Sequence, residues 1–409
     1  MILFSHPTGN QNVRHAALAF ARAGMLAEFW TCIQWDESGL LDRLLPAGIR
    51  RELRRRSFPQ ELQEFIRTSP WRELARQLAG RLGGAGLSGK GTGAFSVDAV
   101  YRALDRRVAR RLASCRDVTA VYGYDDGALE TFRAAKAAGV ATIYEHPIIH
   151  WRMVRRIQEE EAVLHPAWIP TLGALRDSAE KFDRKDEELA LADQIVVAST
   201  FSADSLALAP RLKAKIHVVP YGAPPATKSS NADPVGGRLR VLFVGGLSQA
   251  KGLGYLLKAA ERLGHHIELT LAGKRLSAAI PEQAALDRHR WIPSLPHDEL
   301  LAEMSRQDVL VLPSLHEGFG LVILEAMSQG LTVITTAHTG GPDVIQDGRE
   351  GFIVPIRSVD AIVEKLELLA GDRAMLTGMK EAAQKKAALL TWEGYRSRLV
   401  EVVRGCLKV

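Results

Sequence analysis

The chain has 409 residues and a net charge of +6, with 46% hydrophobic and 24% charged residues. This length corresponds to two or more domains, each able to bury a core without disulfide or metal staples. The three cysteines, Cys32, Cys115 and Cys406, are odd in number and far apart, which argues against a disulfide framework and favours a cytoplasmic protein. The sequence shows no signal peptide and no apolar run of about 20 residues that would predict a transmembrane helix.

The positive charge is concentrated in the first third of the chain. Residues 1–120 hold 19 basic and 11 acidic side chains, whereas the remainder is close to balance. Such a charge attracts an anionic membrane surface or an anionic acceptor. The alternative interpretation is a solvated helical face rich in arginine. Nucleic-acid binding is not indicated, because the basic region has no recognised motif and no interleaved aromatic residues.

Short apolar runs alternate with longer amphipathic runs through the first half of the chain. This alternation predicts a parallel β-sheet covered by helices on both faces. The predicted strands are 2–5, 27–33, 118–122, 141–144 and 194–198, and the clearest predicted helices are 13–23 and 127–138. Residues 39–82 and 96–114 are instead predicted to be mostly helical and basic.

Residues 83–93 are dense in glycine and are interpreted as a loop. Gly84, Gly89 and Lys90 come close to the spacing of a phosphate-binding P-loop. The motif requires Ser or Thr after the lysine, but the chain has Gly91 there, and the segment follows a predicted helix rather than a strand. A P-loop is therefore not predicted.

Residues 222–237 read GAPPATKSSNADPVGG and predict an interdomain linker. The alternation of strand and helix then begins again, with strands at 239–244, 267–271, 309–312 and 332–335, and helices at 253–263, 298–306 and 321–329. The expected fold class is therefore α/β, with two consecutive α/β/α domains. We place their boundaries at 1–221 and 222–390.

The segment 313–330, PSLHEGFGLVILEAMSQG, carries the strongest functional signal. A buried strand leads through glycines into a helix, and the free N–H groups at a helix N-terminus form an anion-binding site. Glu317 lies in the loop, and Glu325 lies within the helix on a largely apolar face. A carboxylate there needs a strong donor, and the two hydroxyls of a ribose would satisfy it. Taken alone, Glu325 is better explained by a structural pairing with a partner such as arginine.

Glu317 and Glu325 are separated by seven residues, and this segment resembles the EX7E motif of retaining GT-B glycosyltransferases, family GT4 in particular. The resemblance implies two Rossmann-like domains facing a cleft. It implies that Glu325 binds the nucleotide ribose and that Glu317 contacts the donor sugar beside its anomeric carbon. The backbone near Gly318, Phe319, Gly320 and Leu321 would hold sugar hydroxyls and diphosphate.

Residues 243–252, FVGGLSQAKG, resemble the phosphate loop of the same family. The resemblance implies that Gly245 and Gly246 approach the donor and that Lys251 neutralises the leaving diphosphate. Many family members carry an arginine where this chain has Gly246, and Lys274 or Arg275 is the candidate replacement. Considered alone, Lys251 would be a solvated lysine at the start of a helix.

Three further segments extend the resemblance. Residues 218–224, VVPYGAP, resemble the family's entry into the second domain, and residues 337–351, AHTGGPDVIQDGREG, resemble its closing motif. In the closing motif, Gly340 and Gly341 are placed to approach sugar hydroxyls. Residues 391–409 resemble the terminal helix that crosses back onto the first domain.

The N-terminal domain, which is expected to bind the acceptor, resembles the family less closely. Gly9 and Asn10 follow the first strand and match a cleft-facing loop, with Gly9 assigned to the donor and Asn10 to the acceptor. His146 follows a strand at a position where the family often has a histidine near the reacting sugar, although a lone histidine is more often structural. Asp125 and Asp126 follow another strand end, where open α/β sheets place ligands. These two residues and His146 are the other acceptor candidates, with His146 also a catalytic candidate.

Arg152, Arg155 and Arg156 form a cluster after Trp151. The cluster is a candidate contact for an anionic lipid-linked acceptor. The alternative is that it faces solvent or pairs with residues 159–161.

The sequence therefore predicts a retaining glycosyltransferase of the hexosyltransferase type that uses a nucleotide-sugar donor and needs no metal or other cofactor. The expected acceptor is a saccharide, glycolipid or small molecule, with surface polysaccharide or glycolipid synthesis at the inner membrane face as the leading interpretation. A sugar-nucleotide 2-epimerase and a noncatalytic nucleotide-sugar-binding protein remain alternatives. Product analysis without acceptor separates transfer from epimerisation, because an epimerase converts the sugar while it stays on the nucleotide.

Overall fold

The computed structural model describes residues 1–39, 42, 45–81, 93–226, 237–276, 281 and 283–407, and it contains two parallel β-sheets. The first is seven-stranded in the order β3-β2-β1-β4-β5-β6-β7, and every neighbouring pair is parallel. Its strands are β1 (Ile2–Ser5), β2 (Leu26–Thr31), β3 (Ile66–Thr68), β4 (Ala120–Tyr124), β5 (Ala141–Glu145), β6 (Gln194–Val197) and β7 (Lys215–Val218).

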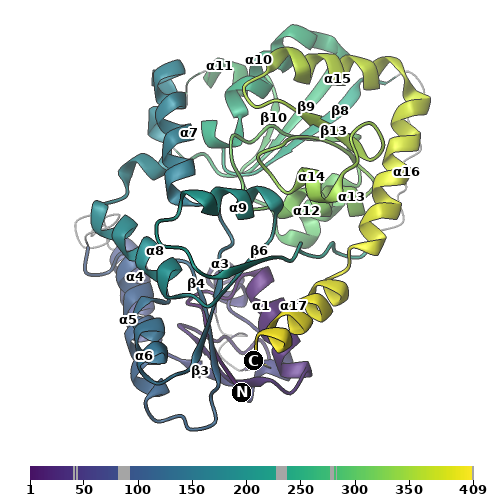
Figure 1. Cartoon of the computed structure of the whole chain (residues 1–409). Coiled ribbons are helices and arrows are strands. Elements are labelled where there is room, and N and C mark those ends of the chain that lie inside the picture. The colour runs from purple at the N-terminus through teal and green to yellow at the C-terminus, as the bar shows by residue number, and fades with distance from the viewer. Residues whose placement is uncertain are drawn as a thin grey trace.

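The second sheet is six-stranded and also parallel throughout, in the order β10-β9-β8-β11-β12-β13. Its strands are β8 (Leu239–Val244), β9 (Ile267–Ala272), β10 (Arg290–Ile292), β11 (Val309–Leu312), β12 (Thr332–Thr336) and β13 (Gly351–Val354). Figure 1 shows the two sheets in separate lobes, each flanked by helices. The predicted α/β class with two such units is confirmed.

Helices follow most strands, as parallel pairing requires, because each return to the start of the sheet needs a crossover connection. The first part of the chain contains α1 (Gln11–Arg22), α3 (Ala47–Arg54), α4 (Trp71–Arg81), α5 (Val97–Leu112), α6 (Leu129–Ala137), α7 (Trp151–Leu164), α8 (Ala179–Leu191) and α9 (Thr200–Ser205). The second contains α10 (Leu253–Leu263), α11 (Gln283–Leu286), α12 (His297–Met304), α13 (Leu321–Ser328), α14 (Gly341–Val344), α15 (Val359–Gly371), α16 (Arg373–Leu389) and α17 (Trp392–Cys406). Short 3₁₀ turns include η2 (Pro166–Thr171), η3 (Gly173–Arg176) and η5 (Gln249–Lys251).

The structure differs from the sequence-based expectation in four short strands. The prediction of mostly helical structure over residues 39–82 was wrong at β3, which pairs with β2 at the edge of the first sheet. Strands β7, β10 and β13 were also not predicted. Strands this short carry few alternating positions, so the sequence signal is weak and pairing with a neighbouring strand defines them. The glycine-rich loop at 83–92 and residues 227–236 of the proposed linker lie outside the described residues.

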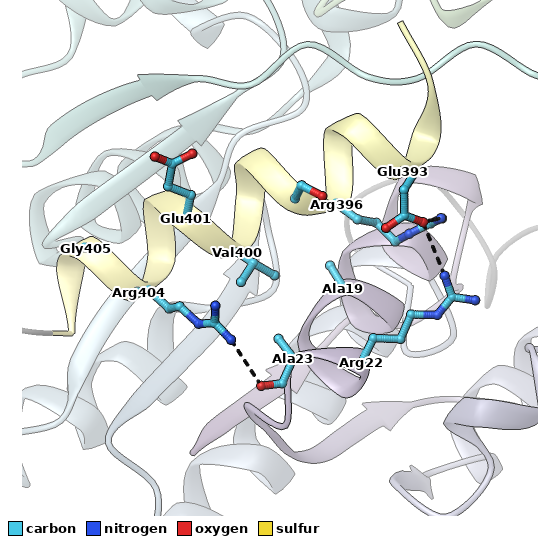
Figure 2. Close-up of a pocket in the computed structure, with 10 residues that line it drawn as sticks. Ala19, Arg22, Ala23, Glu393, Arg396, Val400, Glu401, Arg404 and Gly405 are labelled. Carbon is cyan, nitrogen blue, oxygen red and sulfur yellow. Dashed lines mark hydrogen bonds and ion pairs between the residues drawn. The ribbon is translucent and has the colours of Figure 1, made fainter.

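Helix α17 crosses from the second lobe onto α1 of the first, as Figures 1 and 2 show. Its side chains Trp392, Tyr395, Leu399 and Val403 recur at helical spacing, and all four are buried. Burying each large apolar side chain stabilises the docked helix by about 1.5–3 kcal/mol. The Thr391 hydroxyl caps the helix by accepting the Gly394 N–H at 3.0 Å. The predicted return of the C-terminal helix to the first domain is confirmed.

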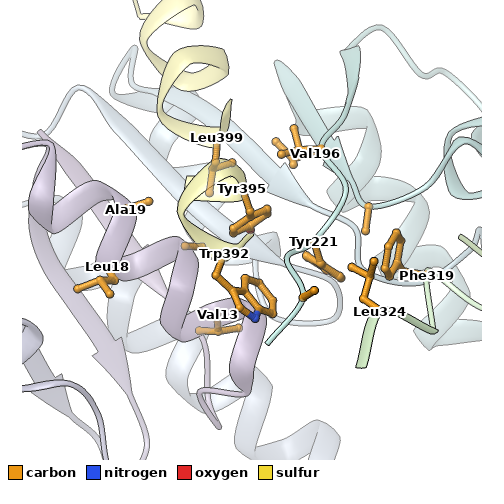
Figure 3. Packing of buried hydrophobic residues seen from close by; sticks show 14 of the residues in the cluster. Val13, Leu18, Ala19, Val196, Tyr221, Phe319, Leu324, Trp392, Tyr395 and Leu399 are labelled. Carbon is orange, nitrogen blue, oxygen red and sulfur yellow. The ribbon is translucent and has the colours of Figure 1, made fainter. Parts of the chain in front are cut away.

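The same aromatic cluster extends into the junction between the lobes, as Figure 3 shows. The Tyr221 ring lies 5.6 Å from Tyr395 and 5.4 Å from Phe319, measured between ring centroids. One continuous hydrophobic core therefore runs from α1 through α17 and Tyr221 to the start of α13. Within the described residues, no helix combines the length and apolar composition needed to cross a lipid bilayer.

Helix α7 and the turn η2 lie beside the second lobe, although they precede β6 of the first sheet in the chain (Figure 1). Ile157 of α7 and Trp168 of η2 are buried in the hydrophobic core of the second sheet. The apolar side chains of this segment thus find their partners across the lobe boundary. Sequence order alone gave no sign of this packing.

Candidate active site

The proposed phosphate loop and the EX7E loop are held together by close backbone contacts. Gly252, which has φ 72°, lies so near Pro313 that a Cβ atom would be 2.0 Å from the Pro313 carbonyl oxygen. The Leu315 N–H also donates to the Ala250 carbonyl at 2.9 Å. Only glycine allows the first of these contacts, so the sequence AKG brings Lys251 beside the loop that carries Glu317.

Lys251 and Glu317 form a direct ion pair. The same carboxylate oxygen of Glu317 accepts the Ser314 hydroxyl at 3.0 Å, and the Glu317 N–H donates to the His338 carbonyl at 2.9 Å. The side chains are 32% and 12% exposed for Lys251 and Glu317, so the lysine remains open to a ligand. An arriving diphosphate would compete with Glu317 for the ammonium group.

The start of α13 supplies backbone donors next to this pair. Gly320 has φ 83° and forms the N-cap of the helix, a conformation that strongly favours glycine. Among the described residues, the N–H groups of Phe319, Gly320 and Leu321 have no protein acceptor. These are the groups that the sequence assigns to the donor, and the first turn of a helix leaves them free for an anion.

The side chain of Phe319 is buried and belongs to the hydrophobic junction, so only its backbone is available to a ligand. Its ring also accounts for Gly340, where a Cβ atom would come within 2.3 Å of the Phe319 ring. Likewise a Cβ on Gly341 would lie 2.4 Å from the methyl group of Thr335. The two glycines of the closing motif thus have a packing role here in addition to the ligand role that the sequence suggests.

Gly318 joins the two lobes. A Cβ atom there would be 1.8 Å from the Pro147 carbonyl oxygen, so glycine is required for the contact. The Gly318 carbonyl accepts hydroxyl hydrogen bonds from Ser199 at 2.6 Å and from Ser202 at 2.8 Å. The EX7E loop is therefore docked directly against the first lobe.

Glu325 lies on α13 and is 9% exposed. Its closest charged partner is His297, whose Nδ1 lies 3.7 Å from the carboxylate. Burial raises the pKa of Glu325, and His297 opposes this shift. The carboxylate is short of strong donors, which is the condition under which ribose hydroxyls would be favourable partners.

The surroundings of Gly246 include Leu276 and the two candidate replacements for an arginine, Lys274 and Arg275. A Cβ atom on Gly246 would meet the Leu276 side chain at 3.0 Å, so Leu276 covers this position. Arg275 stacks over Trp291 at 4.1 Å and pairs with Asp287 at 3.6 Å, while Lys274 is exposed. Gly245, which directly follows β8, has φ 150°, a conformation that residues with a side chain rarely adopt.

The candidates from the first lobe form a buried charge cluster. Asp125 pairs with Lys185, accepts the Tyr144 hydroxyl at 2.8 Å and lies 3.3 Å from His146 Nδ1. Burial alone would raise the pKa of Asp125, but Lys185 and His146 outweigh it and hold the pKa below its usual range. Burial, and then Asp125, raise the pKa of Asp126. The structure brings His146, Asp125 and Asp126 together in one cluster. They contact one another and Lys185, and none of the three lines the cavity that contains Lys251 and Glu317.

Gly9 and Asn10 serve the start of α1. The Asn10 side chain accepts the Val13 N–H at 3.2 Å and caps the helix. Gly9 has φ 63°, and a Cβ atom would lie 2.4 Å from the Phe58 ring. Among the described residues, neither lines the cavity that contains Lys251 and Glu317. Their proposed ligand roles remain predictions.

A cavity of about 350 Å³ lies between the lobes at the Lys251–Glu317 pair. The first lobe and the α7 segment contribute mostly apolar side chains, and the EX7E loop contributes His316, Glu317 and Gly318. The lining residues are Ile148, Ile149, Trp151, Val154, Gln158, Ala174, Asp177, Phe182, Lys185, Ala250, Lys251, His316, Glu317 and Gly318. This size suits a small-molecule ligand.

Sequence reasoning missed His316 and Gln158. The Gln158 amide oxygen accepts the Ala174 N–H at 3.0 Å, so its amide nitrogen faces His316 Nε2 at 3.0 Å as the donor. Burial lowers the pKa of His316 to about 4. The imidazole is therefore neutral at pH 7, with its proton on Nδ1. The adjacency of His316 to Glu317 was the only available signal, since Gln158 lies far away in sequence.

Sequence reasoning also missed Glu161, which supports the phosphate loop from α7. Its fully buried carboxylate accepts hydrogen bonds from Gln249 at 2.6 Å, Tyr255 at 2.7 Å and Arg357 at 2.8 Å. The Gln249 N–H in turn donates to the Thr171 hydroxyl at 3.1 Å. Gln249 begins the turn that ends at Lys251, so α7 and η2 position the lysine.

The arginine cluster after Trp151 is paired within the protein. Arg155 and Arg156 bind Glu159 and Glu160 one helical turn later, at 2.7 and 3.2 Å. Arg152 instead binds Asp186 of α8 at 2.8 Å. The predicted pairing with residues 159–161 is therefore confirmed for Arg155 and Arg156. Arg152 has a partner that the sequence did not suggest.

Part of the chain is similar in sequence to known proteins. Residues 227–386 match the family model described as glycosyl transferases group 1. D-inositol 3-phosphate glycosyltransferase of Corynebacterium urealyticum is 30% identical over 177 residues, covering 40% of this chain and 42% of that protein. The protein of the same name from Mycobacterium tuberculosis is 30% identical over 193 residues, covering 44% and 39%. The aligned region thus spans about two-fifths of these curated relatives.

Solved structures match over nearly the whole chain. Sucrose-phosphate synthase from Thermosynechococcus elongatus superposes with a TM-score of 0.68 at 16% identity, covering 99% of this chain and 98% of that one. Alr3699/HepE of Anabaena, solved in complex with UDP-glucose, superposes with a TM-score of 0.63 at 14% identity, covering 99% of each chain. At this identity the likeness shows the fold. The chain therefore has the GT-B fold, and its residues 227–386 match the model of the glycosyl transferases group 1.

Proposed function

We propose that this protein is a retaining glycosyltransferase that moves a sugar, a hexose in the simplest case, from a nucleotide-sugar donor to an acceptor hydroxyl. The observation that carries the proposal is the Lys251–Glu317 pair beside the free N–H groups of α13, with Glu325 buried further along the same helix. The match of residues 227–386 to glycosyl transferases group 1 supports it. So does the UDP-glucose complex of a protein with the same fold.

In the proposed reaction, the acceptor oxygen attacks the anomeric carbon from the face on which the diphosphate leaves. The bond from the anomeric carbon to the phosphate oxygen breaks, the new glycosidic bond forms, and the acceptor proton passes to the departing phosphate. Lys251 and the N–H groups at the start of α13 stabilise the negative charge that develops on the leaving group. Glu317 faces the positive charge that develops at the sugar. Contact between the lobes at Gly318 limits the entry of water.

A ligand panel tests the donor assignment. Thermal unfolding is followed with UDP, GDP, ADP, dTDP and their common sugars, first with EDTA and then with Mg²⁺. One nucleotide class should raise the melting temperature, because a ligand that binds only the folded state stabilises it. The shift should persist in EDTA, since we propose that Lys251 and backbone donors replace a divalent ion.

Glu325→Ala should remove most of this shift, because the buried carboxylate would no longer bind the ribose. A loss of affinity of about tenfold or more is expected, since charge-assisted hydrogen bonds contribute about 1.5–3 kcal/mol. Glu364→Ala is the matched control, because Glu364 is an exposed glutamate on a helix of the same lobe. An unchanged shift in Glu325→Ala would contradict the ribose role. Conversion of the sugar on the nucleotide without acceptor would indicate an epimerase.

We also propose that the protein works at the inner membrane face in surface polysaccharide or glycolipid synthesis. Helix α4 supports this proposal, since Trp71, Leu74 and Leu78 share one helical side and are 80%, 38% and 58% exposed. Arg72 on the same helix is also exposed. The first 120 residues hold 19 basic and 11 acidic side chains, an excess of positive charge that would favour an anionic surface.

The membrane proposal predicts that the protein co-sediments with vesicles of anionic phospholipid and that Trp71→Glu reduces the bound fraction several-fold. The substitution removes an exposed aromatic anchor and adds a negative charge. Leu389→Glu is the control, because Leu389 is 78% exposed on the second lobe. Equal binding of both variants would show that α4 is not the contact.

A further inference from the structure

The cavity beside Lys251 and Glu317 has an apolar side that the reaction described above does not use. Ile148, Trp151, Val154 and Phe182 line it. Ile148 is 40% exposed, which is high for a residue in such a cluster and leaves apolar area for a ligand. Exposed apolar surface within a concave site is the usual mark of a ligand pocket.

The apolar side is held rigid before any ligand binds. The Trp151 and Phe182 rings stack with centroids 4.1 Å apart and planes 17° from parallel. The Trp151 indole N–H donates to Asp186 at 2.8 Å, and the Arg152 guanidinium lies over the Trp151 ring at 4.2 Å. A preorganised surface loses little conformational entropy when it binds an apolar group.

The charged groups that line the cavity already have partners. Lys185 pairs with Asp125 and lies 3.1 Å from Asp126, and Asp177 lies 3.3 Å from Lys181. The pair of Lys251 and Glu317 would be rearranged by the donor diphosphate rather than by the acceptor. The residues that line the cavity include two cations, Lys185 and Lys251, and two carboxylates, Asp177 and Glu317, so their charges sum to zero. A phosphate group on the acceptor, in addition to the donor diphosphate, would bring unbalanced charge into a partly buried site.

The polar end of the cavity instead offers neutral hydrogen-bonding groups. His316 and Gln158 lie there, 3.0 Å apart, and both line the cavity. Because His316 is adjacent to Glu317 in the chain, these groups lie on the side of the cavity where the donor sugar is proposed to react. A neutral hydroxyl-bearing group suits this end, and an apolar group suits the other.

We propose that this cavity is an acceptor site for a neutral glycoside or alcohol that carries an apolar aglycone, with the aglycone against Ile148, Trp151, Val154 and Phe182. The inference rests on the proposed glycosyltransferase function and adds the substrate class. It sets this chain apart from the curated relatives, whose name specifies inositol 3-phosphate as their substrate.

Isothermal titration of the full chain with n-octyl β-D-glucopyranoside, below its micelle concentration, and with D-glucose 6-phosphate tests the inference. The octyl glucoside should bind at least tenfold more tightly. Val154→Gln should weaken octyl glucoside binding about tenfold or more, since it places a polar amide against the aglycone. Val163→Gln on the same helix is the control, because Val163 is 81% exposed and does not line the cavity. If Val154→Gln fails to fold, Val154→Ala should still give a loss of several-fold.

Tighter binding of glucose 6-phosphate, or equal octyl glucoside binding by the wild type and the Val154 variants, would overturn the inference. Failure of the glycosyltransferase proposal has a different signature. In that case no nucleotide would stabilise the protein, while octyl glucoside would still bind in a Val154-dependent manner. A normal nucleotide response together with a preference for the phosphorylated sugar would refute only the acceptor class.

Discussion

Glu317→Ala should lower the rate of nucleotide release from the donor at least about 100-fold, the range seen when one preorganised electrostatic group is removed from an active site. Two losses add up in this variant. The carboxylate no longer faces the developing positive charge at the anomeric carbon. Lys251 also loses its charged partner and the geometry that the Ser314–Glu317 contact gives it.

The measurement is the release of free nucleoside diphosphate from the donor that the ligand panel identifies. Affinity for the bare nucleotide should change little or even rise, since Lys251 is freed to bind phosphate. Glu317→Gln keeps the size of the side chain and can still accept the Ser314 hydrogen bond, so it tests the effect of losing the negative charge alone. We expect it to be nearly as inactive as Glu317→Ala. Wild-type turnover in either variant would refute the assignment of Glu317.

Glu161→Ala should lower the free energy of unfolding by about 3–5 kcal/mol, the cost of removing one partner from a buried ion pair. The substitution leaves three donors, on Arg357, Tyr255 and Gln249, without their shared acceptor. The Glu161 carboxylate is fully buried, so solvent does not reach this position to replace it. It also frees the turn from Gln249 to Lys251. We therefore expect the KM for the donor to rise in addition to the loss of stability.

Urea unfolding and donor kinetics measure these two effects. Glu159→Ala is a matched control from the same helix, because Glu159 forms an exposed i,i+4 pair with Arg155 and such pairs contribute at most about 1 kcal/mol. Glu161→Gln should restore part of the stability and part of the donor affinity, since its amide oxygen still accepts a hydrogen bond. Unfolding midpoints that coincide for Glu161→Ala and Glu159→Ala would mean that α7 does not anchor the phosphate loop.

The positioning role makes α7 more than a connection between β5 and β6. Its first turns line the acceptor cavity through Trp151, Val154 and Gln158, and its last turns hold Gln249 through Glu161. A single helix therefore borders both the proposed acceptor site and the proposed diphosphate site. Glu161 ties the end of α7 to the second lobe, whereas Trp151 and Arg152 tie its start to Asp186 of α8, so the helix bridges the two lobes.

Features that depend on local pattern were predictable from the sequence. Continuous apolar runs such as 239–244 and 309–312 mark buried parallel strands, and the glycines at 318 and 320 mark a sharp entry into α13. The family resemblance implied that Lys251 and Glu317 each face the donor, and the structure adds that their side chains contact each other. The regular helical spacing of Trp392, Tyr395, Leu399 and Val403 is likewise visible in the sequence.

The way in which distant segments share the site depends on long-range packing, which local patterns do not specify. Asp125, Asp126 and His146 follow strand ends, as predicted, but their partners Lys185 and Glu188 come from α8, so they form a buried cluster instead of an open polar surface. Burial raises the pKa of Glu188 to about 8, a shift that no local pattern could reveal.

The placement of α7 and η2 shows the same limit. Glu161 in the sequence is one of three consecutive glutamates and has the pattern of a solvated helix face, yet it is fully buried while its two neighbours are exposed. Whether a side chain is buried depends on which surface packs against its helix. That surface belongs here to residues 249, 255 and 357, whose contacts with α7 form across the boundary between the lobes.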